Sequence, residues 1–185
     1  MRQELKKPSH VFPMPTTLVG AQVGGKANFI TIAWNGVVDY GVISVSLGKT
    51  RYTTKGIREN GTFSVNIPSE KLVVETDHCG TVSGKDVDKS KVFKVFYGKL
   101  KTAPMIEKCP VAMECKVLQT YEFQTHDLFV GEIAATYADE RVITDGVIDP
   151  AKIKPFFFTT TDLSYYKLGA KISKAWEPGK KYKGK

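Results

Sequence analysis

The chain has 185 residues, the size of a single domain that can bury a substantial core without disulfides. Hydrophobic residues make up 42% and charged residues 25%, a soluble globular composition that excludes disordered, collagen-like and membrane-spanning classes. The formal net charge of +8 is the unusual feature. A basic chain can bind a nucleic acid or an anionic membrane, so the distribution of this charge along the sequence matters.

That positive charge is concentrated at the two ends of the sequence. Residues 1–7 carry a net charge of +2 and residues 167–185 one of +6, which leaves residues 8–166 formally neutral. The interleaved aromatic and basic residues typical of single-strand nucleic-acid binders are absent. We therefore expect no nucleic-acid and no membrane partner. The C-terminal lysines are either a solvated end or a surface that attracts an acidic redox partner.

The N-terminus and the cysteines indicate a cellular compartment. The first ten residues have no long apolar run after their charges, so we expect neither a secretory signal nor a transmembrane helix. Cys79, Cys109 and Cys115 are odd in number and lack C-x-x-C spacing, which fits a reducing compartment and argues against structural zinc. The sequence predicts a cytoplasmic protein with free thiols and no metal site.

Strand signals begin at Thr17. Residues 17–23 and 26–34 are apolar runs around Gly24-Gly25, which predicts a tight β-hairpin. In residues 42–48 apolar and polar side chains alternate with the period of a half-buried strand, and this places Ser46 at a strand end.

A mixed segment follows. Residues 51–60, ended by Gly61, predict a short helix with glycine in the left-handed position after its end. Residues 62–67 predict a strand stopped by Pro68. Ser69 can then cap a helix over residues 70–79, which leads into a polar loop.

The longest strand signals lie in the second half of the chain. Residues 111–123 and 128–138 predict two antiparallel strands joined by the polar residues 124–127, and residues 155–161 predict a final strand. Six or seven sequential strands with two or three short helices indicate an antiparallel barrel, and the glycine loops of dinucleotide and phosphate binding are absent. With three histidines and no triad spacing, the chain fits cofactor chemistry better than side-chain chemistry.

Five motifs in order carry a resemblance. They are N-F-I-T-I-A-W (28–34), S-L-G-K-T-R-Y-T (46–53), F-S-V-N-I-P-S (63–69), C-G-T-V-S-G-K-D-V-D-K (79–89) and T-H-D-L-F-V-G-E (125–132). Together they resemble the flavin reductase-like family with an FMN-binding split barrel, and within it the flavoredoxin branch. The resemblance implies one antiparallel split β-barrel domain over residues 11–176, with an N-terminal extension (1–10) and a basic C-terminal tail (177–185).

The resemblance also implies a homodimer with FMN bound noncovalently near the interface. Its phosphate-binding positions fall on Ser46, Lys49, Arg51 and Thr53, with Ser83 and Lys89 from the polar loop as further contacts. Its isoalloxazine positions fall on Asn28, Thr31, Ala33, Trp34, His126 and Phe157, and Leu47 and Cys79 complete the cofactor-binding set. His126 is the candidate catalytic residue, because a histidine can donate to the flavin edge or assist proton delivery. The alternative to cofactor binding is that these residues are ordinary surface or core residues.

One position departs from the family pattern. Relatives commonly have arginine where this chain has Gly48, so either Arg51 replaces that cation or the phosphate is held less tightly. The function implied is an FMN-dependent oxidoreductase that takes electrons from NAD(P)H or a small redox protein. The alternative is a noncatalytic FMN-binding carrier of the flavoredoxin type. None of the motifs distinguishes NADH from NADPH.

Overall fold

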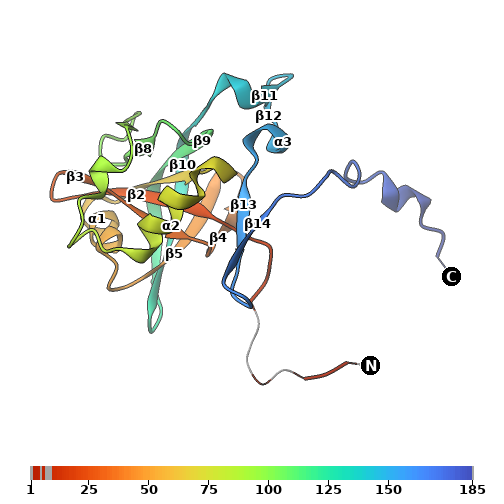
Figure 1. Cartoon of the computed structure of the whole chain (residues 1–185), viewed down its shortest axis with the longest axis horizontal. Helices are drawn as coiled ribbons and strands as arrows, with labels where there is room; N and C mark the ends of the chain where they lie inside the picture. Colours follow the sequence, from red (N-terminus) through yellow and green to blue (C-terminus); the bar gives the residue numbers. More distant parts are fainter. Residues whose placement is uncertain (1, 5, 7–9, 185) are drawn as a thin grey trace.

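The computed structural model describes residues 2–4, 6 and 10–184, and strands dominate it (Figure 1). The elements in chain order are β1 (Met14–Pro15), β2 (Thr17–Val23), β3 (Lys26–Ile32), β4 (Asn35–Asp39), β5 (Val42–Gly48), α1 (Tyr52–Asn60), β6 (Thr62–Ile67), η1 (Glu70–Leu72), α2 (Val73–Thr81), η2 (Lys89–Lys91), β7 (Val95–Phe96), β8 (Met105–Ile106), β9 (Val111–Glu122), β10 (His126–Ala138), η3 (Glu140–Val142), β11 (Ile143–Thr144), β12 (Val147–Ile148), α3 (Pro150–Ile153), β13 (Phe156–Thr159), β14 (Ser164–Lys167) and η4 (Pro178–Lys181).

Seven of these strands form one antiparallel sheet in the order β3-β2-β6-β9-β10-β5-β4. Its two edge strands, β3 and β4, are consecutive in the chain, so Ala33 and Trp34 alone connect opposite edges of the sheet. A two-residue connection can span the edges only if the sheet curls until they approach each other. The backbone N–H of Ser46 donates to the Trp34 carbonyl at 2.8 Å and fixes this connection against β5.

Two hydrophobic clusters lie on the two faces of the curled sheet. Val19 of β2 and Ile30 of β3 belong to the inner cluster, which also holds side chains from β5, β6, β9, β10 and α1. Their neighbours Leu18 and Phe29 point the opposite way, into an outer cluster that includes Leu72 of η1 and Cys79 of α2. Because β2 and β3 are covered on both faces, apolar residues follow one another at Leu18-Val19 and Phe29-Ile30 instead of alternating with polar ones.

The structure confirms the main predicted elements. Gly24 and Gly25 have φ values of 56° and 77°, the left-handed conformation that a two-residue hairpin turn requires. Helix α1 ends as predicted: Gly61 has φ 64° and its N–H donates to the Ile57 carbonyl at 2.9 Å. The long antiparallel pair is β9 and β10.

Other predictions were wrong in detail. The Ser69 side chain caps no helix, and a 3-10 turn, η1, precedes α2. Residue 126 opens β10 instead of lying in the connection, which is shortened to 123–125. The exposed strand β4 was not predicted because its sequence, N-G-V-V-D, shows no buried face. The last predicted strand is limited to Phe156–Thr159.

A second sheet, β1-β13-β14, stands beside the main one and leads into residues 168–184, which we call the C-terminal arm. The arm runs away from the body of the molecule (Figure 1). Within the described part of the chain, no helix is long and apolar enough to cross a membrane.

Candidate functional site

Two adjoining cavities lie where the ends of β3 and β5 meet α1, α2 and the second sheet. The larger cavity, of about 430 Å³, is lined by residues of β3, β5 and α2 and by the β13–β14 hairpin. The smaller cavity, of about 220 Å³, is lined by the start of α1 and by residues 82–84 and 89. Ile30 and Arg51 line both cavities, so one elongated ligand can occupy the two together.

Most of the candidate residues from the sequence come together here. The larger cavity is lined by Thr31, Ala33, Trp34, Ser46, Leu47, Arg51 and His126, and the smaller by Asn28, Arg51, Thr53, Ser83 and Lys89. Lys49, Cys79 and Phe157 line neither cavity.

The smaller cavity has the features of an anion site. Helix α1 begins after Arg51 with no side-chain cap and no acidic residue in its first turn. The N–H groups of Tyr52 and Thr53 have no backbone partner among the described residues, so these two groups and the positive dipole end remain available. Arg51 is exposed and lines the cavity from this end. The Arg51 guanidinium, the available N–H groups and the positive end of the α1 dipole all face the smaller cavity. This arrangement favours the binding of a phosphate or a carboxylate.

Lys89 contributes a second cation from the opposite side. Its side chain is 3% exposed, and Nζ donates to the carbonyls of Phe29 at 3.0 Å and Cys79 at 2.8 Å. Burial is the main cause that lowers the pKa of Lys89, and the positive charge of Arg51 lowers it further. No carboxylate among the described residues pairs with Lys89 or Arg51. A bound anion would offset this repulsion between two neighbouring cations.

Buried polar groups give the smaller cavity its shape. Asn28 Nδ2 donates to Thr53 Oγ1 at 2.7 Å, and both residues are buried. Gly84 packs so closely on this pair that an added Cβ would lie 2.1 Å from Asn28 Oδ1 and 2.7 Å from Tyr52 Cδ1. Only glycine fits at this position, which holds the polar loop against the start of α1.

Gly48, the position at which the chain departs from the family pattern, lies beside Arg51. A Cβ added at Gly48 would lie 3.4 Å from Arg51 Cγ and 3.9 Å from His126 Nε2. Arg51 therefore covers the space beside residue 48, at the junction of the two cavities. This position favours the alternative in which Arg51 takes over the role of the missing cation.

The larger cavity has an aromatic wall. The rings of Trp34 and His126 lie 4.7 Å apart at an interplanar angle of 38°, and His10 stacks on Trp34 at 5.4 Å. His126 Nδ1 is 2.8 Å from Thr125 Oγ1, which leaves Nε2 for a ligand in the cavity. Trp34 is 40% exposed, so it forms a rim rather than part of the core.

Two threonines bring polar groups to the same cavity. Thr16 Oγ1 is buried and has no hydrogen-bond partner among the described residues, although Thr16 lines the cavity. The Thr31 hydroxyl donates to the Thr76 carbonyl and ties β3 to α2. A buried hydroxyl without a partner is costly, so a polar ligand that reaches Thr16 would remove this cost. The cavity therefore suits a ligand with both an aromatic plane and polar edges.

Tyr165 and Asp77 form a pair in the larger cavity that the sequence did not reveal. The Tyr165 hydroxyl donates to Asp77 Oδ1 at 2.9 Å, across 88 residues of sequence. Burial, followed by the hydrogen bond to Asp77, raises the pKa of Tyr165 to about 12. Tyr165 therefore remains a neutral phenol at physiological pH. No local motif marks this pair, because it is formed only when β14 packs beside α2.

The structure places three candidates elsewhere. Lys49 Nζ faces carboxylates, 3.6 Å from Glu122 and 3.9 Å from Asp127, instead of the smaller cavity. Phe157 stacks on Tyr166 with ring centroids 5.6 Å apart, while its neighbour Phe158 lines the larger cavity. Because successive side chains of a strand point to opposite faces, Phe158 rather than Phe157 faces this cavity.

Cys79 is fully buried in the outer hydrophobic cluster, and only its carbonyl reaches the site, through Lys89. Burial raises the pKa of the thiol to about 11. Since the thiolate is the reactive form, about one molecule in a thousand would carry it at pH 8. We expect Cys79 in the folded protein to react with iodoacetamide about 100-fold more slowly than in the unfolded chain. Peptide mapping by mass spectrometry would measure this, and equal labelling rates would contradict the burial described.

Comparisons with known proteins agree with this geometry. A family profile described as "Flavin reductase like domain" matches residues 9–155. The chain is similar to the flavoredoxin of Methanosarcina acetivorans (44% identity, TM-score 0.94, 97% of this chain and 98% of that one). It is also similar to the flavoredoxin of Desulfovibrio vulgaris (Miyazaki F) (32%, 0.89, 97% and 100%). An FMN-binding protein of Thermus thermophilus matches at 25% identity and TM-score 0.76, over 90% of this chain and 93% of that one.

These structural matches confirm the predicted antiparallel split β-barrel. The profile covers well over half of the chain, and the flavoredoxin matches extend over nearly all of it. The chain therefore belongs to the flavin reductase-like family.

Proposed function

We propose that this protein binds FMN across the two cavities and works as a flavin-dependent oxidoreductase. The observation that carries the proposal is a pair of cations, Arg51 and Lys89, at the uncapped start of α1 and beside a larger cavity with an aromatic rim. Neither cation has a carboxylate partner in the part of the chain that the structure describes. Arg51, Lys89 and the first amides of α1 would hold the phosphate. The similarity to an FMN-binding protein and to two flavoredoxins supports the choice of ligand.

The residues of the larger cavity would bind the ring system. Trp34 and His126 offer aromatic surface, and the hydroxyls of Thr16 and Thr31 offer polar contacts at the edge. Bound FMN supplies the redox chemistry, accepting two electrons from a donor and passing them on. The protein's part is to orient the ring in the larger cavity and to hold the phosphate with Arg51 and Lys89. His126 Nε2, which the contact of Nδ1 with Thr125 leaves available, would donate or accept a proton at the ring edge.

The electron donor divides the proposal into two forms. In the first, NADH or NADPH reduces the bound flavin directly, as in an NAD(P)H-dependent reductase. In the second, a small redox protein supplies electrons and the chain is a noncatalytic FMN-binding carrier. The similarity to two flavoredoxins over nearly the whole chain favours keeping the second form as the alternative. In both forms of the proposal the reduced protein passes its electrons to an acceptor.

An anaerobic stopped-flow experiment separates the two forms. The FMN-loaded protein is mixed with NADH or with NADPH, and loss of the oxidised flavin absorbance is followed. Direct reduction by either nicotinamide at a rate that saturates with its concentration would support the reductase. A flavin that chemical reductants reduce but neither nicotinamide does would identify the carrier. A protein that binds no FMN would contradict both forms.

A further inference from the structure

The larger cavity contains a carboxylate, whereas the smaller cavity is lined by cations. Asp77 is the only acidic residue among the described residues that line either cavity, and it lines the larger one alone. Arg51 lines both cavities and Lys89 lines the smaller one. Asp77 forms no ion pair with the residues that the structure describes. The site is therefore polarised, with positive charge where the phosphate would bind and negative charge where the ring system would lie.

Helix α2 holds Asp77 at the wall of the larger cavity. Asp77, Gly80 and Thr81 all line this cavity, and their spacing of three and four residues places them on one face of the helix. A Cβ added at Gly80 would lie 3.3 Å from Thr31 Cβ, so this face packs closely on β3. The Thr31 hydroxyl donates to the carbonyl of Thr76, the residue before Asp77. Asp77 thus belongs to a helical turn that is fixed against the main sheet.

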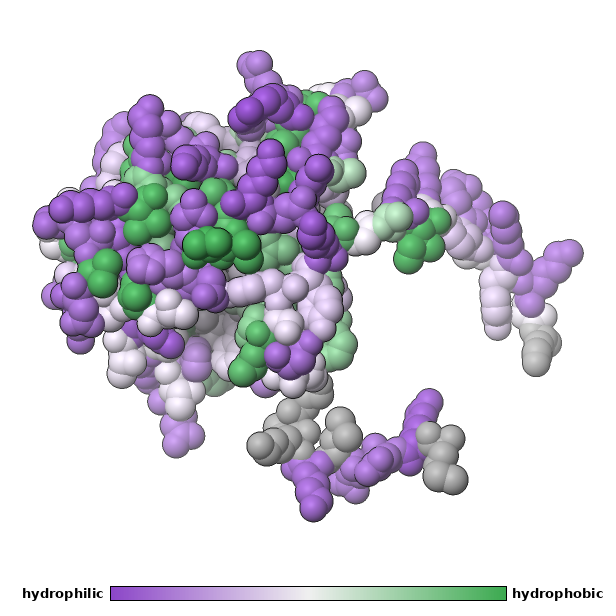
Figure 2. All heavy atoms as spheres, in the orientation of Figure 1, coloured by the Kyte–Doolittle hydropathy of each residue, from purple (hydrophilic) through white to green (hydrophobic). Residues whose placement is uncertain are grey.

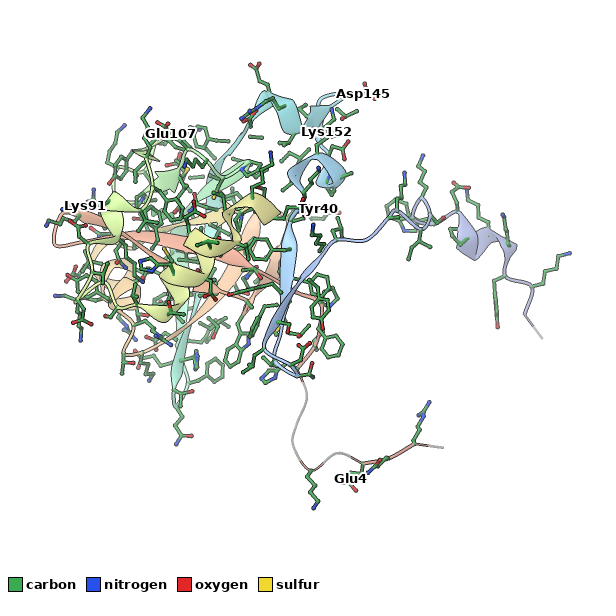
Figure 3. The ribbon with its side chains drawn as sticks, in the orientation of Figure 1. Glu4, Tyr40, Lys91, Glu107, Asp145 and Lys152 are labelled. Carbon is green, nitrogen blue, oxygen red and sulfur yellow. The ribbon has the colours of Figure 1, made fainter. Side chains whose placement is uncertain are left out.

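Tyr165 holds the Asp77 carboxylate from the β13–β14 hairpin. Its hydroxyl donates to Asp77 Oδ1 at 2.9 Å. Tyr165 lies opposite Phe158 in this strand pair, so both side chains project from the same face and both line the cavity. The Tyr165 ring also packs edge-on against the buried Phe156, with centroids 5.4 Å apart. The hydrogen bond therefore joins the hairpin to α2, and side chains of both elements fill the space between their ribbons (Figure 3).

A negative charge at this wall acts more strongly on a reduced flavin than on an oxidised one. Two electrons and one proton, taken from the donor, leave the ring of FMN with one more negative charge than the oxidised ring. A nearby like charge disfavours that form, and the repulsion is stronger where the ring excludes water. Hydrophilic residues cover much of the surface around α2 (Figure 2), and charges there act weakly through water and salt. A carboxylate that lines the cavity is therefore the one expected to affect the ring.

We propose that Asp77, held in place by Tyr165, lowers the reduction potential of the bound FMN. The inference rests on the FMN site proposed above, and it applies to both forms of that proposal because it concerns the flavin and not its electron donor. Asp77 adjusts the potential of the cofactor, and Tyr165 is a positioning residue because it acts through Asp77. The arrangement makes the reduced protein a stronger reductant toward its acceptor.

The midpoint potential of the FMN-loaded protein tests the role of Asp77. It is measured at pH 8 by anaerobic titration with dithionite against a reference dye. Asp77→Asn removes the charge with little change in shape. We expect this substitution to strengthen the binding of reduced FMN relative to oxidised FMN about tenfold, which raises the two-electron potential by about 30 mV.

Glu75→Gln is the matched control for this measurement. It removes the same charge from the same helix, but Glu75 lines neither cavity. This variant should change the ratio of the two affinities by about twofold or less. If Asp77→Asn binds FMN but leaves the potential unchanged, or if Glu75→Gln shifts it equally, the inference is overturned while the proposed function stands. An unchanged protein that binds no FMN would contradict the proposed function, and the inference with it.

A double-substitution cycle tests the role of Tyr165. Tyr165→Phe retains the ring that packs on β13 and removes the hydroxyl, so the released carboxylate can turn toward water. The potential should rise by part of the shift seen in Asp77→Asn. In a protein that already carries Asp77→Asn, the same substitution should leave the potential unchanged, because no charge remains to be held. Equal shifts in the two backgrounds would overturn the positioning role of Tyr165.

Discussion

Replacing Arg51 with alanine is expected to raise the Kd for FMN about 10- to 150-fold. A hydrogen bond to a charged group contributes about 1.5–3 kcal/mol, and about 1.4 kcal/mol corresponds to a factor of ten in affinity. Arg51 lines both cavities and has no carboxylate partner among the described residues, so its charge is free for the phosphate. Titration of the apoprotein with FMN, followed by quenching of flavin fluorescence, measures the effect.

Lys49→Ala is the control for this prediction. Lys49 is close in sequence and has the same charge, but it faces Glu122 and Asp127 and lies outside both cavities. Exposed charges act weakly through water and salt, so the Kd should change by about twofold or less. If Lys49→Ala weakened FMN binding as much as Arg51→Ala, the phosphate site would lie on the other side of the β5–α1 loop from the one assigned here.

Gly56→Ala in helix α1 is expected to destabilise the protein by about 2 kcal/mol or more, within the range for overpacked interiors. In an exposed helix the same change would stabilise by about 1 kcal/mol, because alanine has the higher helix propensity. Here an added Cβ would lie 2.2 Å from the Gln22 carbonyl oxygen and 2.8 Å from Val23 Cγ2. The backbone of β2 cannot yield as a flexible side chain could. The helix must shift, and its uncapped N-terminus shifts with it.

Urea unfolding measures this effect, and FMN titration shows whether the phosphate site moves with the helix. Lys55→Ala is the matched control in the same helix, because Lys55 is exposed and its ion pair with Glu59, at 3.6 Å, lies on the surface. It should change the free energy of unfolding by less than about 0.5 kcal/mol. A Gly56→Ala protein as stable as the unchanged one would contradict the close packing of α1 on β2.

Much of the fold could be predicted because its signals are local. The Gly24-Gly25 pair requires left-handed backbone angles, which marks the hairpin, and Gly61 marks the end of α1 in the same way. The long strands β9 and β10 are recognisable by their length and composition. Strand β4 lacked such a signal, because neither of its faces is buried.

The candidate site was predictable to the extent that family motifs fix it. The motifs at 28–34, 46–53 and 79–89 converge on the two cavities, although they are far apart in the sequence. The directions of individual side chains depend on tertiary packing and could not be predicted from the motifs. The ion pairs that turn Lys49 away from the cavity involve Asp127, a buried carboxylate of β10, and the direction of Phe157 depends on the register of β13 with β1.

The sharpest test of the central claim is a calorimetric titration of the apoprotein with FMN and, separately, with riboflavin, which lacks the phosphate. If Arg51, Lys89 and the start of α1 bind the phosphate, FMN should bind one per chain and at least about tenfold more tightly than riboflavin. The difference should largely disappear in Arg51→Ala. Equal affinity of the unchanged protein for the two flavins, or no binding of either, would contradict the assignment of the two cavities.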